Sequence, residues 1–226
     1  MSNDAPALSI KVILGSTREG RFGDKPAHWI LGELGQRPGV EAELLDLRDF
    51  PLPFFDRATA PSREGGKYAS PAVTRWSEKI GPADAFVVVA PEYNHGYPAV
   101  LKNAFDHLFP EWARKPIGFV SYGSVGGARA IEQLRLVAVE LQMWPIRHAI
   151  HLPLDVYLAA LKEPVPPNPA VFAPAQERLW HRPRRPVPGR ALVGRARPQG
   201  RPQRGVAAAR YCSTMISAGS ARATTG

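Results

Sequence analysis

Cysteine is nearly absent from this sequence of 226 residues, which contains only Cys212. A single cysteine excludes an internal disulfide framework and any metal cluster built from several thiolates. Long apolar runs are also missing, since no segment approaches the roughly 20 residues that a membrane-spanning helix needs. The start of the chain, MSNDAPALS, is polar and lacks the basic and apolar regions of a secretory signal. We therefore expect a soluble cytoplasmic protein without a membrane partner.

The C-terminal end lacks lysine and almost lacks acidic residues. Residues 164–226 contain 11 arginines, no lysine and one acid, a net charge of +10, whereas residues 1–163 carry 18 basic and 19 acidic residues, a net charge of −1. The formal charge of +9 for the whole chain therefore belongs to this end and says nothing about the remainder. A basic run is most often a solvated tail, so the charge does not by itself predict a nucleic-acid partner.

Strand and helix patterns alternate over the first part of the chain. The segment AFVVVA is apolar throughout, as is typical of a strand buried on both faces of a parallel sheet. The predicted strands are 8–14, 40–47, 85–90, 116–123 and a fifth within 144–154; the predicted helices are one capped by Asp24 and ended at Gly35, then 71–80, 98–109 and 126–142. This order predicts an α/β fold with a five-stranded, parallel, doubly wound sheet between two helical layers.

Residues 164–226 show no sustained strand or helix period and hold 10 of the 24 prolines. Such a segment buries too little apolar surface to offset the entropy lost on ordering. We therefore predict one folded domain over residues 1–163, followed by a disordered, Arg/Pro-rich tail.

Three loops should carry the function. Doubly wound sheets bind ligands beyond the carboxyl ends of their strands, at the point where the strand order reverses. The first loop (residues 15–23), the second loop (91–97) and the third loop (121–127) follow predicted strands one, three and four. The sequence therefore predicts a ligand site between these three loops.

The first loop, which contains GSTREGRF, joins a strand to a helix N-terminus, where amide groups and the helix dipole favour an anion. Ser16 and Thr17 add hydroxyls, and Arg18 and Arg21 add charge-assisted donors suited to a phosphate. As a P-loop it fails, because Arg21 replaces the lysine and Phe22 replaces the magnesium-binding hydroxyl. The loop can be interpreted as a phosphate-binding site or as a solvated turn.

The second loop, PEYNHGY, offers an aromatic side chain, an amide and backbone groups, as a flat heterocycle with a polar edge requires. Rim packing is the alternative for its tyrosines, and a solvated side chain is the expectation for His95. The third loop, SYGSVGG, has glycines that permit close backbone approach, although alone it could be a plain strand-to-helix turn.

At these three loops the sequence resembles the NADPH-dependent FMN reductase family of flavodoxin-like folds, which includes azo- and quinone-reducing enzymes. The matching segments are GSTREGR (15–21), PEYNHGYPAVLKNAFD (91–106) and SYGSVGGARAIEQLR (121–135), of which the second is the most specific. The resemblance covers about residues 8–155 and implies a flavodoxin-like fold.

The resemblance implies bound FMN and the co-substrate NAD(P)H, with electrons passing to a quinone, azo, flavin or similar small-molecule acceptor. It names no catalytic side chain and no metal. It also implies a homodimer or homotetramer, because FPLPFFD (50–56) resembles a family loop that reaches toward a partner. The residues that it implies for FMN binding are Gly15, Ser16, Thr17, Arg18, Arg21 and Phe22, then Pro91, Glu92, Tyr93 and Asn94, and then Ser121, Tyr122, Gly123, Gly126 and Gly127.

Three other functions fit parts of the sequence. A flavodoxin-like electron carrier would bind FMN without reacting with NAD(P)H, but such carriers are usually more acidic than the net charge of −1 found over residues 1–163. A P-loop NTPase is disfavoured by Arg21 and Phe22. A nucleic-acid binder would act through the arginine-rich end, by non-specific phosphate contacts.

The C-terminal end departs from the family pattern, which usually closes with one more amphipathic helix over the sheet. Here VYLAALKEPVPP begins such a helix, and a segment rich in Arg, Pro, Gly and Ala follows it. A reading frame shifted near residues 175–180 and a genuine disordered tail both account for this composition.

Overall fold

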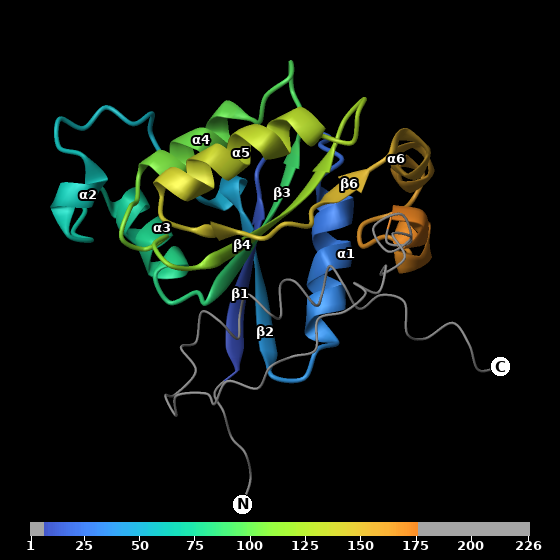
Figure 1. Cartoon of the computed structure of the whole chain (residues 1–226), viewed down its shortest axis with the longest axis horizontal. Coiled ribbons are helices and arrows are strands. Elements are labelled where there is room, and N and C mark those ends of the chain that lie inside the picture. The colour runs from blue at the N-terminus through green and yellow to red at the C-terminus, as the bar shows by residue number, and fades with distance from the viewer. Residues whose placement is uncertain (1–6, 176–226) are drawn as a thin grey trace, which may run out of the picture.

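The computed structural model describes residues 7–175, which form a parallel sheet between two layers of helices (Figure 1). The sheet has the order β2-β1-β3-β4-β5, and β6 also pairs with β4. The strands are β1 (Leu8–Leu14), β2 (Val40–Asp46), β3 (Ala85–Pro91), β4 (Pro116–Tyr122), β5 (Trp144–Pro145) and β6 (Ile150–Leu152). This order is that of flavodoxin, and it confirms the predicted fold class.

The central strands β3 and β4 are buried along their whole length, because helices cover both of their faces. Their ladder places Pro91 opposite Tyr122. On the other side of β3, the ladders of β1 place Leu14 opposite both Val89 and Asp46. The carboxyl ends of β1, β2, β3 and β4 therefore share one edge, and the three predicted loops leave from it.

Two separate cores pack against the two faces of the sheet. Helix α1 (Asp24–Gly35) and helix α6 (Leu154–Leu161) cover one face, and the other is covered by α3 (Pro71–Ile80), α4 (Ala99–Asp106) and α5 (Ala128–Glu140) (Figure 1). Each helix turns an apolar stripe to the sheet, as Val73, Trp76 and Ile80 do in α3. No helix within residues 7–175 is both long enough and apolar enough to cross a membrane.

The predicted fifth strand is divided into β5 and β6. Both pieces pair with β4, while residues 146–149 between them lie outside any strand. The amides of Trp144 and Ile146, on either side of Pro145, donate to the carbonyl oxygens of Lys115, directly before β4, and of Ile117 in β4, at 2.9 Å each. Three short elements were not predicted at all: η1 (Leu47–Asp49), α2 (Pro61–Glu64) and η2 (Pro169–Phe172).

The described structure continues past residue 163, where the sequence predicts the start of the tail. The short helix η2 (Pro169–Phe172) packs on α1, where the fully buried Phe172 ring stacks on Trp29 with centroids 4.6 Å apart. A single anchoring aromatic among prolines has no period, so the sequence pattern did not reveal it. The remainder of the predicted tail, residues 176–226 with Cys212, lies outside the described residues.

Candidate functional site

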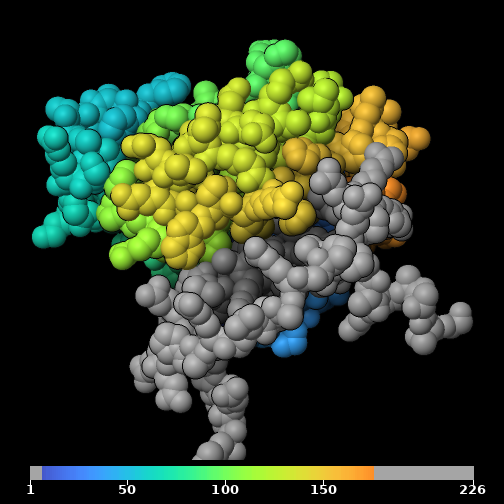
Figure 2. Space-filling model, viewed as in Figure 1, coloured from blue at the N-terminus to red at the C-terminus, as the bar shows by residue number. Residues whose placement is uncertain are grey.

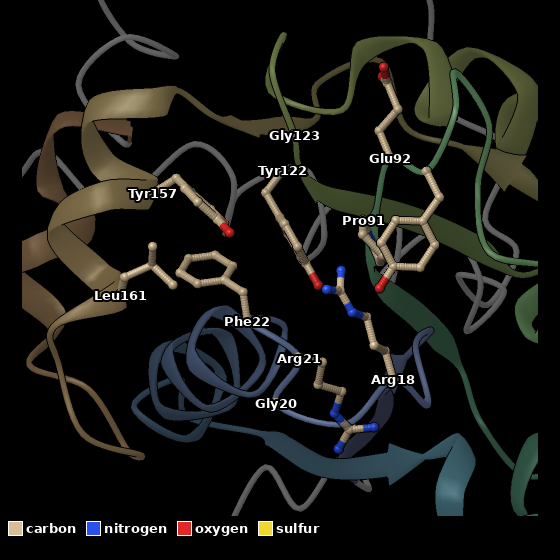
Figure 3. A pocket seen from close by; sticks show the side chains of 11 residues that line it. Arg18, Gly20, Arg21, Phe22, Pro91, Glu92, Tyr122, Gly123, Tyr157 and Leu161 are labelled. Carbon is tan, nitrogen blue, oxygen red and sulfur yellow. The ribbon is translucent and has the colours of Figure 1, made fainter.

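The three loops border a cavity of about 290 Å³ (Figure 3). This volume lies at the lower end of the roughly 300–1,000 Å³ that is usual for small-molecule sites. The wall consists of Arg18, Gly20, Arg21 and Phe22 from the first loop, Pro91, Glu92 and Tyr93 from the second, Tyr122 and Gly123 at the end of β4, and Tyr157 and Leu161 from α6. The tertiary structure thus brings the predicted loops together around one cavity.

Eight of the fifteen predicted site residues line this cavity. The other seven, Gly15, Ser16, Thr17, Asn94, Ser121, Gly126 and Gly127, are not part of its wall. Most of these seven contact the loops and strands that carry the wall residues.

Gly15 and Ser16 join the first loop to the elements beside it. A Cβ atom at Gly15 would lie 2.9 Å from Leu101 Cδ2 and 3.3 Å from the carbonyl oxygen of Val89, so a side chain there would have to shift Leu101 to let the end of β1 approach α4 this closely. The Ser16 hydroxyl shares a hydrogen bond of 3.0 Å with the hydroxyl of Tyr93 in the second loop. Thr17, by contrast, is exposed.

Glycine also allows the third loop to fold back onto β4. A Cβ atom at Gly127 would lie 1.8 Å from Ser121 Oγ, and the φ angles of Gly126 and Gly127, 67° and 71°, are in the left-handed region that favours glycine. The Ser121 hydroxyl donates to the carbonyl oxygen of Ala90 at 2.7 Å. These residues shape the cavity wall without facing the cavity.

The second loop is a tight turn whose tip is not part of the wall. Tyr93 and Gly96 exchange two backbone hydrogen bonds of 2.8 and 2.9 Å, and Asn94 and His95 between them have φ angles of 49° and 68°. Two left-handed residues in succession are typical of a two-residue hairpin turn, and asparagine tolerates this conformation better than most residues. Asn94 is therefore an exposed turn residue outside the cavity wall, its place beside a ligand stays a prediction, and His95 is exposed as expected.

Glu92 connects the second loop to α5. Its side chain is only 3% exposed, and its carboxylate accepts hydrogen bonds from Arg129 Nε at 2.6 Å and from the Arg129 amide at 3.0 Å. Helix α5 has no side-chain cap of its own, so Glu92 satisfies a free amide at its N-terminus. Burial alone would raise the pKa of Glu92, but these hydrogen bonds lower it below the ordinary 4.5.

Arg21 does not offer its charge to the cavity. Nε and Nη2 donate to Asp24, Nη1 donates to Asp46 at 2.6 Å and to the carbonyl oxygen of Ser16, and Nη2 also donates to Asp46. An arginine has five N–H donors, so none remains for a phosphate. This pairing does not favour the phosphate contact predicted for Arg21, which stays a prediction. It also takes Asp24 away from its predicted role as the helix cap, a position that Gly23 occupies.

Arg18 and Tyr122 are the groups that remain available to an anion. Arg18 is exposed and its guanidinium has no hydrogen-bond or ion-pair partner within residues 7–175. The Tyr122 hydroxyl is buried without a partner in the same range, and Figure 3 shows it directed toward Arg18. Burial raises the pKa of Tyr122 above its ordinary 10.0, so the hydroxyl stays protonated at neutral pH and can donate. An orphaned buried donor beside an unpaired cation predicts an anionic ligand.

Aromatic rings form the other part of the wall. The Phe22 ring lies 4.8 Å from Tyr122 and 4.5 Å from Tyr157, centroid to centroid. Gly23 makes room for this cluster, because a Cβ atom there would lie 2.8 Å from the Tyr122 hydroxyl. Tyr157 and Leu161 were missed from the sequence, although α6 follows the last strand and therefore starts at the same edge of the sheet as the three loops.

The class of protein follows from the fold and the site. A flavodoxin-like sheet with an unpaired arginine, a buried free hydroxyl and aromatic rings at the start of α1 can hold a phosphorylated aromatic mononucleotide. FMN fits this donor set, since its phosphate would meet Arg18 and the Tyr122 hydroxyl. The flavin ring would find Tyr93 and the backbone at Gly123 on the same wall.

Comparison with known proteins identifies the family. Residues 8–155 match the NADPH-dependent FMN reductase family. The chain is 40% identical to an NAD(P)H-dependent FMN reductase of Schizosaccharomyces pombe over 158 residues, which cover 69% of this chain and 78% of the relative. It is 32% identical over 164 residues to a probable NADPH:quinone oxidoreductase of Oryza sativa subsp. japonica, with 70% and 78% of the two chains covered.

Among solved structures, the flavoenzyme NAD(P)H:(acceptor) oxidoreductase FerB of Paracoccus denitrificans superposes with a TM-score of 0.54 at 24% identity, covering 69% of this chain and 85% of that chain. This likeness supports the fold. The chain belongs to the NADPH-dependent FMN reductase family, which confirms the predicted class of NAD(P)H-dependent oxidoreductase with FMN as cofactor.

Proposed function

We propose that the protein binds FMN in the cavity between the three loops and uses it to oxidise NAD(P)H and reduce a small-molecule acceptor. The observation that carries this proposal is the unpaired Arg18 facing the buried, unpartnered Tyr122 hydroxyl at the start of α1. When bound, FMN supplies the hydride and electron transfer, so that the chain has to bind, orient and shield it.

The residues of the wall divide this work between two ends of the cavity. Arg18, the amides of the first loop and the Tyr122 hydroxyl would hold the phosphate. Pro91, Tyr93 and Gly123 would line the ring, where backbone amides can stabilise negative charge. Phe22 and Tyr157 would exclude water between the two ends.

The acceptor is proposed by class. Quinones fit best, because the relative from rice is named as a quinone oxidoreductase, and azo compounds or free flavin are the alternatives that the sequence indicated. An electron carrier without NAD(P)H activity is the rival function. Anaerobic titration of the holoprotein with NADPH separates the two, since a carrier would not bleach its flavin absorption.

Self-association is proposed from one rigid loop and one apolar helix face. Phe54 is 81% exposed, yet Asn103 fixes its neighbours by donating to the carbonyl oxygen of Pro53 at 2.8 Å and accepting from the Phe55 amide at 2.9 Å. Helix α5, which crosses the face shown in Figure 2, exposes Leu136 and Val139. These features support a homodimer or homotetramer, and for its location we keep the cytoplasm that the sequence predicts. Sedimentation of the full chain as a monomer at micromolar concentration would contradict the assembly.

The central experiment compares FMN with riboflavin, which lacks the phosphate. The purified protein should carry a flavin absorption band near roughly 450 nm. Arg18→Ala should weaken FMN binding by roughly 1.5–3 kcal/mol, because a charge-assisted contact to the phosphate is lost. Riboflavin binding should be unchanged in Arg18→Ala, and Arg75→Ala, which removes an exposed arginine from α3, should change neither affinity. Equal FMN affinity in Arg18→Ala and the unmodified protein would contradict the assigned phosphate site.

A further inference from the structure

Three consecutive carbonyl groups of the first loop are held from the side of β2. Arg48, in η1 directly after β2, donates from Nε to the carbonyl oxygen of Thr17 at 3.3 Å and from Nη2 to that of Arg18. Arg21 donates from Nη1 to the carbonyl oxygen of Ser16. Two guanidinium groups therefore orient three successive peptide units.

This arrangement decides where the amide groups of the loop point. In a planar trans peptide the C=O and the following N–H point in opposite directions. Holding the carbonyls of residues 16–18 therefore turns the amides of Thr17, Arg18 and Glu19 the other way. Within residues 7–175 the amides of Thr17 and Glu19 have no acceptor, and that of Arg18 has only a 3.4 Å contact to Ser16 Oγ. Successive free amides on one side of a loop form an anion-binding concavity.

Asp46 anchors both arginines to the sheet. Its carboxylate accepts from Arg21 Nη1 at 2.6 Å and from the Arg48 amide at 2.9 Å, and as the last residue of β2 it lies opposite Leu14 in the ladder. Asp24 supplies a second carboxylate to Arg21. Both aspartates therefore pair with the Arg21 guanidinium, Arg48 is held at Asp46 through its amide, and the Arg18 guanidinium has no partner within residues 7–175.

We propose that Arg21 and Arg48 are positioning residues for the phosphate of the flavin: they hold the loop carbonyls away from the cavity so that its amides face the anion. This inference rests on the proposed FMN site. It separates three arginines into one that contacts the phosphate and two that shape the loop around it. It also predicts that the loop discriminates FMN from riboflavin by backbone geometry as well as by charge.

The test uses Arg48→Ala, because Arg48 is exposed and its removal leaves the core intact. FMN and riboflavin affinities of the apoprotein are measured by fluorescence titration, with the melting temperature as a check on folding. Loss of the carbonyl contacts should weaken FMN binding about tenfold and riboflavin binding less than about twofold. Arg48→Lys should recover part of the loss, since the ammonium can donate to one of the two carbonyls. Arg75→Ala on α3 serves as the matched control for loss of an exposed arginine.

The salt dependence of FMN binding distinguishes positioning from direct contact. A direct contact with the phosphate contributes most to the salt dependence of binding, so Arg18→Ala should flatten the dependence of FMN affinity on salt more than Arg48→Ala does. A slope as flat in Arg48→Ala as in Arg18→Ala, an equal loss of FMN and riboflavin, or no loss at all overturns the inference. Failure of the unmodified protein to bind FMN would instead contradict the proposed function. Arg21→Lys supplies a second variant with the same expected loss of FMN selectivity.

Discussion

The first and third loops border the same cavity but are held in place by different forces. The first loop depends on charge: Arg21, whose side chain is 2% exposed, is paired with two aspartates, and Arg48 adds two more donors to the loop. The third loop depends on the absence of side chains. A Cβ atom at Gly126 would press on His151, and a Cβ atom at Gly127 would overlap Ser121.

The difference matches what each loop would have to bind. A loop held by paired charges can keep its amides and one free arginine open toward an anion, since its other arginine, Arg21, is already paired with Asp24 and Asp46. A loop of glycines lets the backbone come close to the edge of a flat ring. Substitutions should therefore affect the third loop through sterics and the first loop through charge and hydrogen bonding.

The largest effect is expected for Gly127→Ala. The new Cβ atom would overlap Ser121 Oγ and Tyr122 N, and the residue would have to keep a φ of 71°, so the free energy of unfolding should fall by about 2–5 kcal/mol. Gly32→Ala in the interior of α1, where nothing lies within 4 Å, should instead raise it by about 0.5–1 kcal/mol. Urea denaturation monitored by circular dichroism gives both values, and similar results for the two variants would refute the steric account.

The next largest effect is expected for Glu92→Gln, which replaces the one buried charge that supports the second and third loops. Loss of charge-assisted hydrogen bonds to Arg129 and to the start of α5 should lower the free energy of unfolding by about 1.5–3 kcal/mol at neutral pH. The matched control is Glu132→Gln, an exposed carboxylate on the same helix, which should change little.

The pH dependence of that variant gives an independent check. Because the pKa of Glu92 is lowered below 4.5 in the folded protein, its stabilisation is present above that value and is lost as the pH falls through the lowered pKa. The difference between Glu92→Gln and the unmodified protein should therefore be full at pH 7 and shrink progressively below about pH 4.5. A difference that stays constant on acidification would show that the carboxylate charge is not the cause.

A smaller effect, of opposite sign in two measurements, is expected for Tyr122→Phe. Removal of the unpartnered buried hydroxyl should raise the stability of the apoprotein by about 1 kcal/mol, while FMN binding weakens by about 1 kcal/mol. In the control Tyr68→Phe, the lost hydroxyl donates to Glu111 at 2.9 Å, so stability should fall and FMN binding should stay constant. Unchanged flavin affinity in Tyr122→Phe would remove this hydroxyl from the phosphate site.

The smallest effect is expected for Lys102→Ala on α4. Its ion pair with Asp106 is partly exposed, with 43% and 34% of the two side chains accessible, and such i,i+4 pairs contribute at most about 0.5 kcal/mol. A melting temperature within error of the unmodified protein is the expected result. A large fall in the melting temperature would mean that this partly exposed ion pair stabilises the protein as much as the buried ion pairs of the first loop do.

The elements were predictable because their signals are local. The boundaries predicted for β1, α1 and α3 agree with the structure at nearly every residue. The spacing of apolar residues identifies each of these segments, and glycine or proline residues mark the ends of the helices. The interrupted fifth strand and the helix η2 were less predictable. Each depends on what the segment packs against, as Phe172 does on Trp29, and not on a repeating pattern.

The sequence by itself determined the parallel sheet, the three loops on one edge, and the family to which the chain belongs. Only the tertiary structure decided which arginine of the first loop is free. Arg18 and Arg21 are alike in sequence context, but Asp46, 25 residues away, pairs with Arg21 alone. That choice depends on the end of β2 lying beside the end of β1, and ion pairs between distant segments leave no period or motif from which to read them.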